Sequence, residues 1–324
     1  MEKSNIIVAG VPGEGERKKG ITESIISGLR KALGEKKESG ELPVLGEREK
    51  TKEEILRIET VQEFLLKLFD KLNLPQDQCN LETNQIHFLS GEMFAENFSQ
   101  MDSGVGGFFR AGDSAIFMND VISEGIEPAE AEMLKLSDLS HECIHSASHS
   151  KTLANVNPDH TISYGNYRTG YMIVDVGKSE NKFKGFNEGV VCVTDRLMLS
   201  SESEELKKRF QLNDELLQKV GLNAYIENQI LVHTISSRIA EYRNESPSKS
   251  MTRMVRGQFT GEMMHLRDLN HIYGEGSLDL LARYQSSKDM DINEKQDPLI
   301  IQYFQSVDEG ERNELKKEIL SFGN

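Results

Sequence analysis

The chain has 324 residues, and its acidic side chains outnumber the basic ones enough to give a formal net charge of -15. That length suits one large or two ordinary domains, and the charge would repel phosphate backbones, so we expect no nucleic-acid partner. Cys79, Cys143 and Cys192 are odd in number and widely spaced, which argues against a disulfide framework. The apolar run from Ile6 to Val11 is far shorter than the ~20 residues of a membrane-spanning helix. We therefore expect a cytoplasmic protein without a membrane anchor.

The first 54 residues combine a strand-like run, a glycine-containing loop and a helix-like segment. The loop from Gly10 to Gly15 superficially resembles a phosphate-binding loop. Glu16 and Arg17 stand where such a loop needs a lysine followed by a serine or threonine, so we expect no nucleotide site. Residues 34–54 are rich in glycine, glutamate and lysine, a composition typical of a solvated linker. We interpret residues 1–54 as a flexible N-terminal arm and linker.

A folded core is predicted from Ile55 onward. The spacing of apolar residues from Ile55 to Leu72 predicts an amphipathic helix. Residues 85–89 have the pattern of a strand, and residues 105–110 and 114–118 predict two strands joined by a short turn. We expect the strand of residues 114–118 to lie at a sheet edge, where an extended peptide could pair with its main chain.

Residues 128–147 carry the pattern with the clearest chemical meaning. His141, Glu142 and His145 form an H-E-x-x-H motif, which on a helix places both imidazoles one turn apart with the glutamate beside them. Pro128 and the acids that follow it predict the start of this helix. At helical spacing an apolar face (Met133, Leu136, Leu139, Cys143, Ile144, Ala147) opposes a face with Leu134, Asp138, His141 and His145. The motif predicts a zinc ion on the two histidines, with Glu142 as the general base of a peptidase.

A catalytic zinc needs a third protein ligand. The metzincin pattern is excluded because Ser148 and Lys151 occupy the positions of its glycine and third histidine. Two acidic candidates remain: Asp159, in a polar segment predicted to be a loop, and Glu188, at the start of a predicted helix. Glu188 is the better candidate because Asn187 can cap that helix and the apolar residues after it predict a buried element.

Two short motifs together resemble those of the gluzincin metallopeptidases. The motif residues are His141, Glu142 and His145, followed on a second helix by Asn187, Glu188 and Gly189. The resemblance extends over roughly residues 105–200. It implies that His141, His145 and Glu188 bind one Zn²⁺ per chain and that Glu142 is the catalytic base in peptide-bond hydrolysis.

The resemblance also implies groups that no motif here identifies. In the thermolysin-like branch an aspartate four residues after the ligand glutamate orients one zinc histidine, whereas this chain has Cys192 there and Asp195 as a possible replacement. A tyrosine or histidine that steadies the tetrahedral intermediate is also implied, and the candidates are Tyr164, Tyr167, Tyr171 and His233. The remaining histidines of the helices, His149, His265 and His271, are interpreted as structural.

The predicted fold is α+β and zincin-like, with a small mixed sheet that has an antiparallel edge over the active-site helix and a mostly helical C-terminal subdomain. We expect three parts: the arm of residues 1–54, a catalytic domain of residues 55–200 and a helical subdomain of residues 201–324. The expected function is zinc-dependent hydrolysis of a peptide or protein substrate. The alternatives are a non-catalytic, metal-stabilised interaction module and a peptidase dedicated to one intracellular protein. The sequence defines no oligomeric state.

Overall fold

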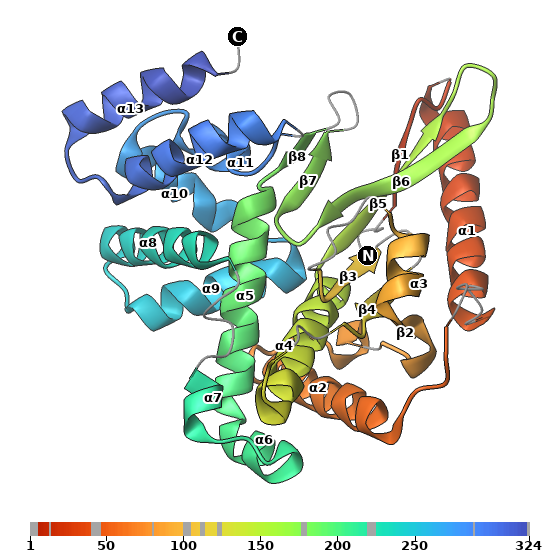
Figure 1. The fold of residues 1–324 in the computed structure, drawn as a ribbon. Helices are drawn as coiled ribbons and strands as arrows, with labels where there is room; N and C mark the ends of the chain where they lie inside the picture. Colours follow the sequence, from red (N-terminus) through yellow and green to blue (C-terminus); the bar gives the residue numbers. More distant parts are fainter. Residues whose placement is uncertain are drawn as a thin grey trace. The chain divides into compact units, whose positions relative to one another are not determined.

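The computed structural model describes residues 6–12, 14–39, 47–79, 81–99, 105–110, 114–121, 125–175, 180–218, 225–287 and 289–322. Helices and two small mixed sheets make up the fold (Figure 1), which confirms the prediction of an α+β protein. The chain divides into two compact units, the first of residues 1–167 and 204–216, the second of residues 168–203 and 217–324. In the part of the chain that is described, no helix is long and apolar enough to cross a membrane.

A five-stranded sheet with the order β1-β5-β6-β7-β8 joins the start of the chain to the strand that follows the H-E-x-x-H helix. β1 (Ile6–Ala9) pairs in parallel with β5 (Ser150–Val156), and β5 neighbours β6 (Ile162–Thr169). After β1 the chain turns at Gly10, where φ is +72° and a Cβ would lie 2.4 Å from the carbonyl oxygen of Val156. Glycine is therefore needed at this position for close backbone approach.

Most of the segment around Asp159 that the sequence predicts to be a loop belongs to β5 and β6. β6 begins at Ile162, and its first four residues are exposed. Because these positions face solvent, polar side chains are compatible with a strand there, but the alternation that marks a half-buried strand is absent. The sequence pattern therefore gave no signal for β6.

The other sheet of the first unit has the strand order β2-β4-β3. β2 (Ile86–Leu89) pairs in parallel with β4 (Ala115–Asn119), and β3 (Gly107–Arg110) pairs antiparallel with β4. The predicted strand pair is confirmed, although its turn at residues 111–113 lies outside the described residues. The prediction that residues 114–118 form an edge strand is wrong, because β4 lies between two strands. Its consecutive buried residues are typical of a central strand.

Two helices of the first unit pack on one another and hold the motif. α2 (Lys52–Lys71) begins with a capping box in which the side chain of Thr51 and that of Glu54 each accept a hydrogen bond from the other's backbone N–H. α2 packs against α4 (Pro128–Ala147). Between them the guanidinium of Arg57 donates two hydrogen bonds to the carboxylate of Glu132, at 2.6 and 3.0 Å. The amphipathic helix predicted for residues 55–72 is confirmed.

Part of the segment predicted to be a linker is attached to the first unit. Arg48 donates hydrogen bonds to both carboxylate oxygens of Glu54 and to Asp120. Glu47 lies 2.9 Å from Nδ1 of His87, a buried residue of β2. Together with β1, these contacts tie both ends of residues 6–54 to the unit. Residues 40–46 lie outside the described residues, and α1 (Gly15–Ser39) precedes them.

The second unit is built mainly from helices. The last two residues of β6 pair with β7 (Met172–Asp175), which pairs antiparallel with β8 (Glu180–Lys182). α5 (Lys184–Ser201) packs on α8 (Ile226–Arg243) and α9 (Pro247–Thr260). The helices after α9 are α10 (Asp268–Tyr273), α11 (Ser277–Arg283), α12 (Met290–Gln305) and α13 (Glu309–Ser321). Their apolar faces share one buried core with α5.

The chain passes from one unit to the other after residues 167, 203 and 216. Phe186, Val190 and Val193 of α5 lie in the core of the C-terminal helices. Conversely, α6 (Ser203–Phe210) belongs to the first unit, where Arg209 pairs with Glu63 of α2 at 2.6 Å. Side-chain packing between segments distant in sequence determines this division. The unit boundaries therefore cannot be predicted from local composition.

The Arg57–Glu132 pair yields a test of how α4 is held. Arg57 is only 6% exposed, so replacing it with methionine would leave the carboxylate of Glu132 without its buried partner. We expect Arg57→Met to lower the free energy of unfolding by about 2–4 kcal/mol, measured by chemical denaturation followed by circular dichroism. Lys67→Met is the matched control, because its pair with Glu63 is solvent-exposed, and it should cost less than about 1 kcal/mol. An equal decrease in the free energy of unfolding of both variants would show that the Arg57–Glu132 pair does not specifically stabilise the contact between α2 and α4.

Candidate metal centre

α4 places the motif as the sequence predicts. Pro128 is the first residue of the helix, where its missing N–H costs nothing, and Ser148 follows the last. Ser148 donates a hydrogen bond through Oγ to the carbonyl oxygen of Ile144 at 2.7 Å, which satisfies one of the carbonyls at the helix end. The predicted apolar face is buried throughout: Met133, Leu136, Leu139, Cys143, Ile144 and Ala147.

The two motif histidines converge on one point. The Nε2 atoms of His141 and His145 are 3.1 Å apart, and the rings meet edge to face at 70°. Two nitrogens bound to one tetrahedral Zn²⁺ at 2.0–2.1 Å would be about 3.3–3.4 Å apart. The observed separation therefore fits two imidazoles that ligate one ion through Nε2.

Glu142 and Asp138 bring carboxylates to the same part of α4. Glu142 is 9% exposed, and Asp138 lies one helical turn before it. Burial, followed by the negative charge of Glu142, raises the pKa of Asp138 to about 6, and His141 acts in the opposite direction. The Asp138 carboxylate packs so closely on the chain before β3 that a Cβ on Gly106 would lie 2.0 Å from its Oδ2. We did not predict a role for Asp138, and its position on the motif face was the only sequence signal.

Glu188, the predicted third ligand, lies on α5 in the second unit. The helix begins at Lys184, after Phe183 in a left-handed conformation, so the prediction that Asn187 caps it is wrong. Asn187 lies inside the first turns, where its Oδ1 accepts hydrogen bonds from the backbone N–H of Tyr171 at 3.0 Å and from Nε2 of Gln258 at 3.1 Å. Asn187 thus anchors the start of β7 to α5 and α9.

Gly189 also has a packing role. A Cβ there would lie 2.5 Å from the backbone oxygen of Asn228, so glycine is needed for the close approach of α5 and α8. Packing thus explains Asn187 and Gly189, whereas the half-buried Glu188 between them is not accounted for by that core. Among the described residues, the His, Cys, Asp and Glu side chains that could together hold a metal ion are His141, His145 and Glu188.

The other acidic candidates have different surroundings. Asp159 is exposed in the turn between β5 and β6, where its Oδ1 accepts hydrogen bonds from the N–H and the hydroxyl of Thr161. These bonds lower the pKa of Asp159 and fully explain an aspartate at this turn. Asp195, the possible replacement for the aspartate that orients a zinc histidine, is buried on α5. Cys192 is also buried and forms no disulfide.

The four candidates for stabilising a tetrahedral intermediate differ in how deeply they are buried. Tyr171 is fully buried, and its hydroxyl lies 2.9 Å from both the carbonyl oxygen of Met254 and Nε2 of His265. Tyr171 is therefore a core residue of the second unit. Burial also lowers the pKa of its partner His265 to about 4. Tyr164 is 56% exposed on β6, Tyr167 is half-buried on the same strand, and His233 is exposed on α8. His271 stacks on Tyr242 at the surface.

Comparisons with protein-family models, with curated proteins and with solved structures return no match for this chain.

The raised pKa of Asp138 predicts a pH-dependent effect of removing its charge. Because the folded pKa lies above the ordinary value, this group stabilises the fold at low pH, and that stability is lost as the pH rises from about 4 through about 6. In metal-free protein we expect Asp138→Asn to raise the free energy of unfolding by roughly 1–3 kcal/mol at about pH 7.5 and to change it little at about pH 4. Denaturant titrations at the two pH values measure this. An equal change in the free energy of unfolding at both pH values would contradict a raised pKa for Asp138.

Proposed function

We propose that the protein is a zinc-dependent hydrolase of peptide bonds, of the gluzincin type, with His141, His145 and Glu188 as metal ligands and a zincin-like arrangement of sheet and helix. The observation that carries the proposal is the 3.1 Å separation of the two histidine Nε2 atoms on a helix that also bears Glu142. A structural zinc site has no need of a base beside its ligands, whereas a hydrolase does. The presence of Glu142 therefore favours catalysis over a metal-stabilised interaction module.

Each residue of the proposed site has a definite role. A bound Zn²⁺ supplies a Lewis acid that polarises a carbonyl and lowers the pKa of water. Glu142 accepts the proton of the attacking water and returns it to the leaving nitrogen. Asp138 adds a second carboxyl group whose charge interacts with both Glu142 and His141. When ionised, it attracts a cation held by the neighbouring neutral imidazoles and so supports metal binding there.

An extended substrate fits β3 better than β4. β3 is an outer strand of its three-stranded sheet in the described part of the chain, and it contacts α4 directly. An outer strand presents unpaired N–H and C=O groups that a peptide can complete as an added strand. We therefore propose that an extended substrate pairs with Gly107–Arg110 and not with residues 114–118. The three cysteines are buried and form no disulfide, which supports a reducing compartment such as the cytoplasm.

The choice of third ligand predicts a ranking of two variants. Glu188→Ala should weaken zinc binding by at least ~10-fold, since loss of even an outer-shell partner costs 10–100-fold. Asp159→Ala should change it little, because that carboxylate is engaged within its own turn. Chelator competition on the two purified variants measures both values. The reverse ranking would retract the gluzincin assignment while leaving the roles of His141, Glu142 and His145 in place.

Removing only the proton acceptor tests the chemistry. Glu142→Gln should retain near-stoichiometric zinc and the same circular dichroism spectrum, yet lose peptide hydrolysis by ~10²-fold or more, because proton transfer by a positioned side chain contributes 10²–10⁴-fold. The measurements are metal analysis and cleavage of a peptide library. His271→Gln is the matched control, since His271 lies on the surface of the second unit. Undiminished hydrolysis in Glu142→Gln would place the chemistry elsewhere, and wild-type protein that binds zinc without any hydrolysis would favour the interaction module.

A further inference from the structure

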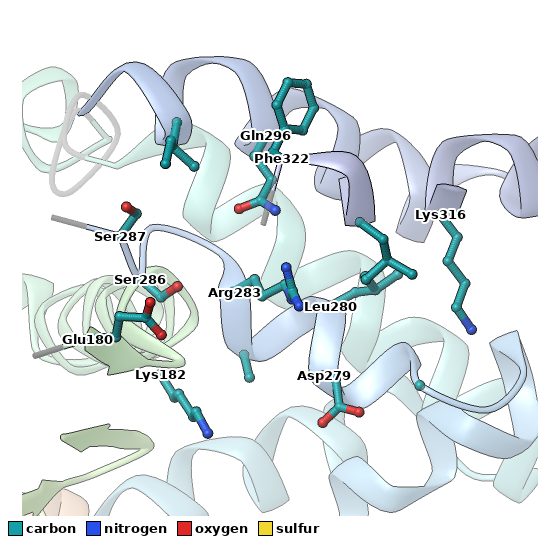
Figure 2. Close-up of a pocket in the computed structure, with 14 residues that line it drawn as sticks. Glu180, Lys182, Asp279, Leu280, Arg283, Ser286, Ser287, Gln296, Lys316 and Phe322 are labelled. Carbon is teal, nitrogen blue, oxygen red and sulfur yellow. The ribbon is translucent and has the colours of Figure 1, made fainter. Parts of the chain in front are cut away.

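The second unit contains a cavity of about 460 Å³ that plays no part in the proposed hydrolysis (Figure 2). Its walls come from β8, α11 and the loop that follows it, α12 and α13. Pockets that enclose small molecules usually measure about 300–1,000 Å³. The cavity is therefore large enough for a metabolite-sized ligand, and it lies entirely within one compact unit.

Hydrogen bonds across the walls hold the cavity in shape. The N–H of Phe183, after β8, donates to the carbonyl oxygen of Ala282 at 2.9 Å. The amide of Gln296, on α12, donates to the carbonyl oxygen of Ile319 on α13 at 3.1 Å. Gln296 itself lines the cavity and is buried. A site that is formed before binding loses less conformational entropy when a ligand enters.

The charged residues of the lining favour an anion. Lys182, Arg283 and Lys316 contribute three positive charges from three different elements, against Glu180 and Asp279. This local excess of cations occurs in a chain whose formal net charge is -15. The two acids make a polyanion unfavourable here, so a ligand with one anionic group is the better match.

Arg283 is the side chain best placed to hold that group. It is half-buried and lies near the centre of the close-up (Figure 2). Its guanidinium forms no hydrogen bond or ion pair with any described residue. Lys316, by contrast, donates to the backbone oxygen of Glu275. A guanidinium presents a planar fork of N–H donors that matches the two oxygens of a carboxylate or phosphate. The apolar part of the lining, from Leu280, Ile292, Leu320 and Phe322, would cover the body of the ligand.

We propose that this cavity binds a small organic oxyanion, with its carboxylate or phosphate group on Arg283 and its apolar body against Leu320 and Phe322. The charge excess and the Arg283 guanidinium, which has no partner in the described part of the chain, specify the anionic end. The apolar wall distinguishes the ligand from an inorganic ion. Carboxylate and phosphate share the recognition chemistry, and separate probes distinguish them.

Calorimetric titration of the full-length chain with phenylacetate, phenyl phosphate and inorganic phosphate, at fixed ionic strength, tests the proposal. At least one aromatic probe should bind saturably with one site per chain, and whichever binds identifies the preferred group. Arg283→Gln should weaken it by at least ~10-fold, as expected for the loss of charge-assisted hydrogen bonds. Arg267→Gln removes the same charge at an exposed position outside the cavity and should leave the affinity unchanged.

Lys316→Gln provides a second variant at the cavity and should weaken the same probe several-fold. Three results would overturn the proposal: no saturable binding of either aromatic probe, equal binding by folded Arg283→Gln, or inorganic phosphate that binds as tightly as phenyl phosphate. The titrations need neither zinc nor hydrolysis, so their outcome is independent of the proposed peptidase activity.

Discussion

Two imidazole nitrogens of the first unit lie 3.1 Å apart on one helix, α4, and this geometry depends on how α4 is held. The geometry of a helix sets the relative positions of side chains on one face. The helix must also be held by its surroundings so that it neither rotates nor frays. The buried apolar face of α4 prevents rotation, and the Arg57–Glu132 pair ties the helix to α2. The surroundings of α4 are thus arranged to preserve a geometry that a free helix would not maintain.

The same helix concentrates charge where burial makes charge costly. Asp138, which is half-buried, and Glu142, which is buried, lie one turn apart, and desolvation raises the pKa of Asp138. A divalent cation held by His141 and His145 would offset the repulsion between the two carboxylates. The electrostatics and the imidazole geometry of α4 therefore independently favour the binding of a metal ion.

In the second unit, two packing residues, Asn187 and Gly189, flank Glu188, the proposed third metal ligand. Asn187 and Gly189 fix α5 against β7, α9 and α8, and this fixes the direction of Glu188 along with the helix. A ligand must be held within about 0.5 Å of its productive position, and a residue between two packing constraints is well suited to that. The cavity around Arg283 is a separate feature of the unit, with its own charge pattern and its own hydrogen-bonded walls.

The sequence by itself determined the elements whose signal is local. The H-E-x-x-H helix, its core face, the amphipathic α2 and the strand pair β3–β4 follow from periodicity and spacing, which short-range geometry converts directly into structure. Tertiary structure decided what depends on partners distant in the chain. β4 became a central strand because β2 pairs on its other side, and residues 6–9 joined a sheet because β5 offered an edge. Asn187 became an anchor for β7, and Asp138 acquired its raised pKa through burial against Gly106. No local pattern encodes these outcomes, because each depends on which surfaces meet once the chain has folded.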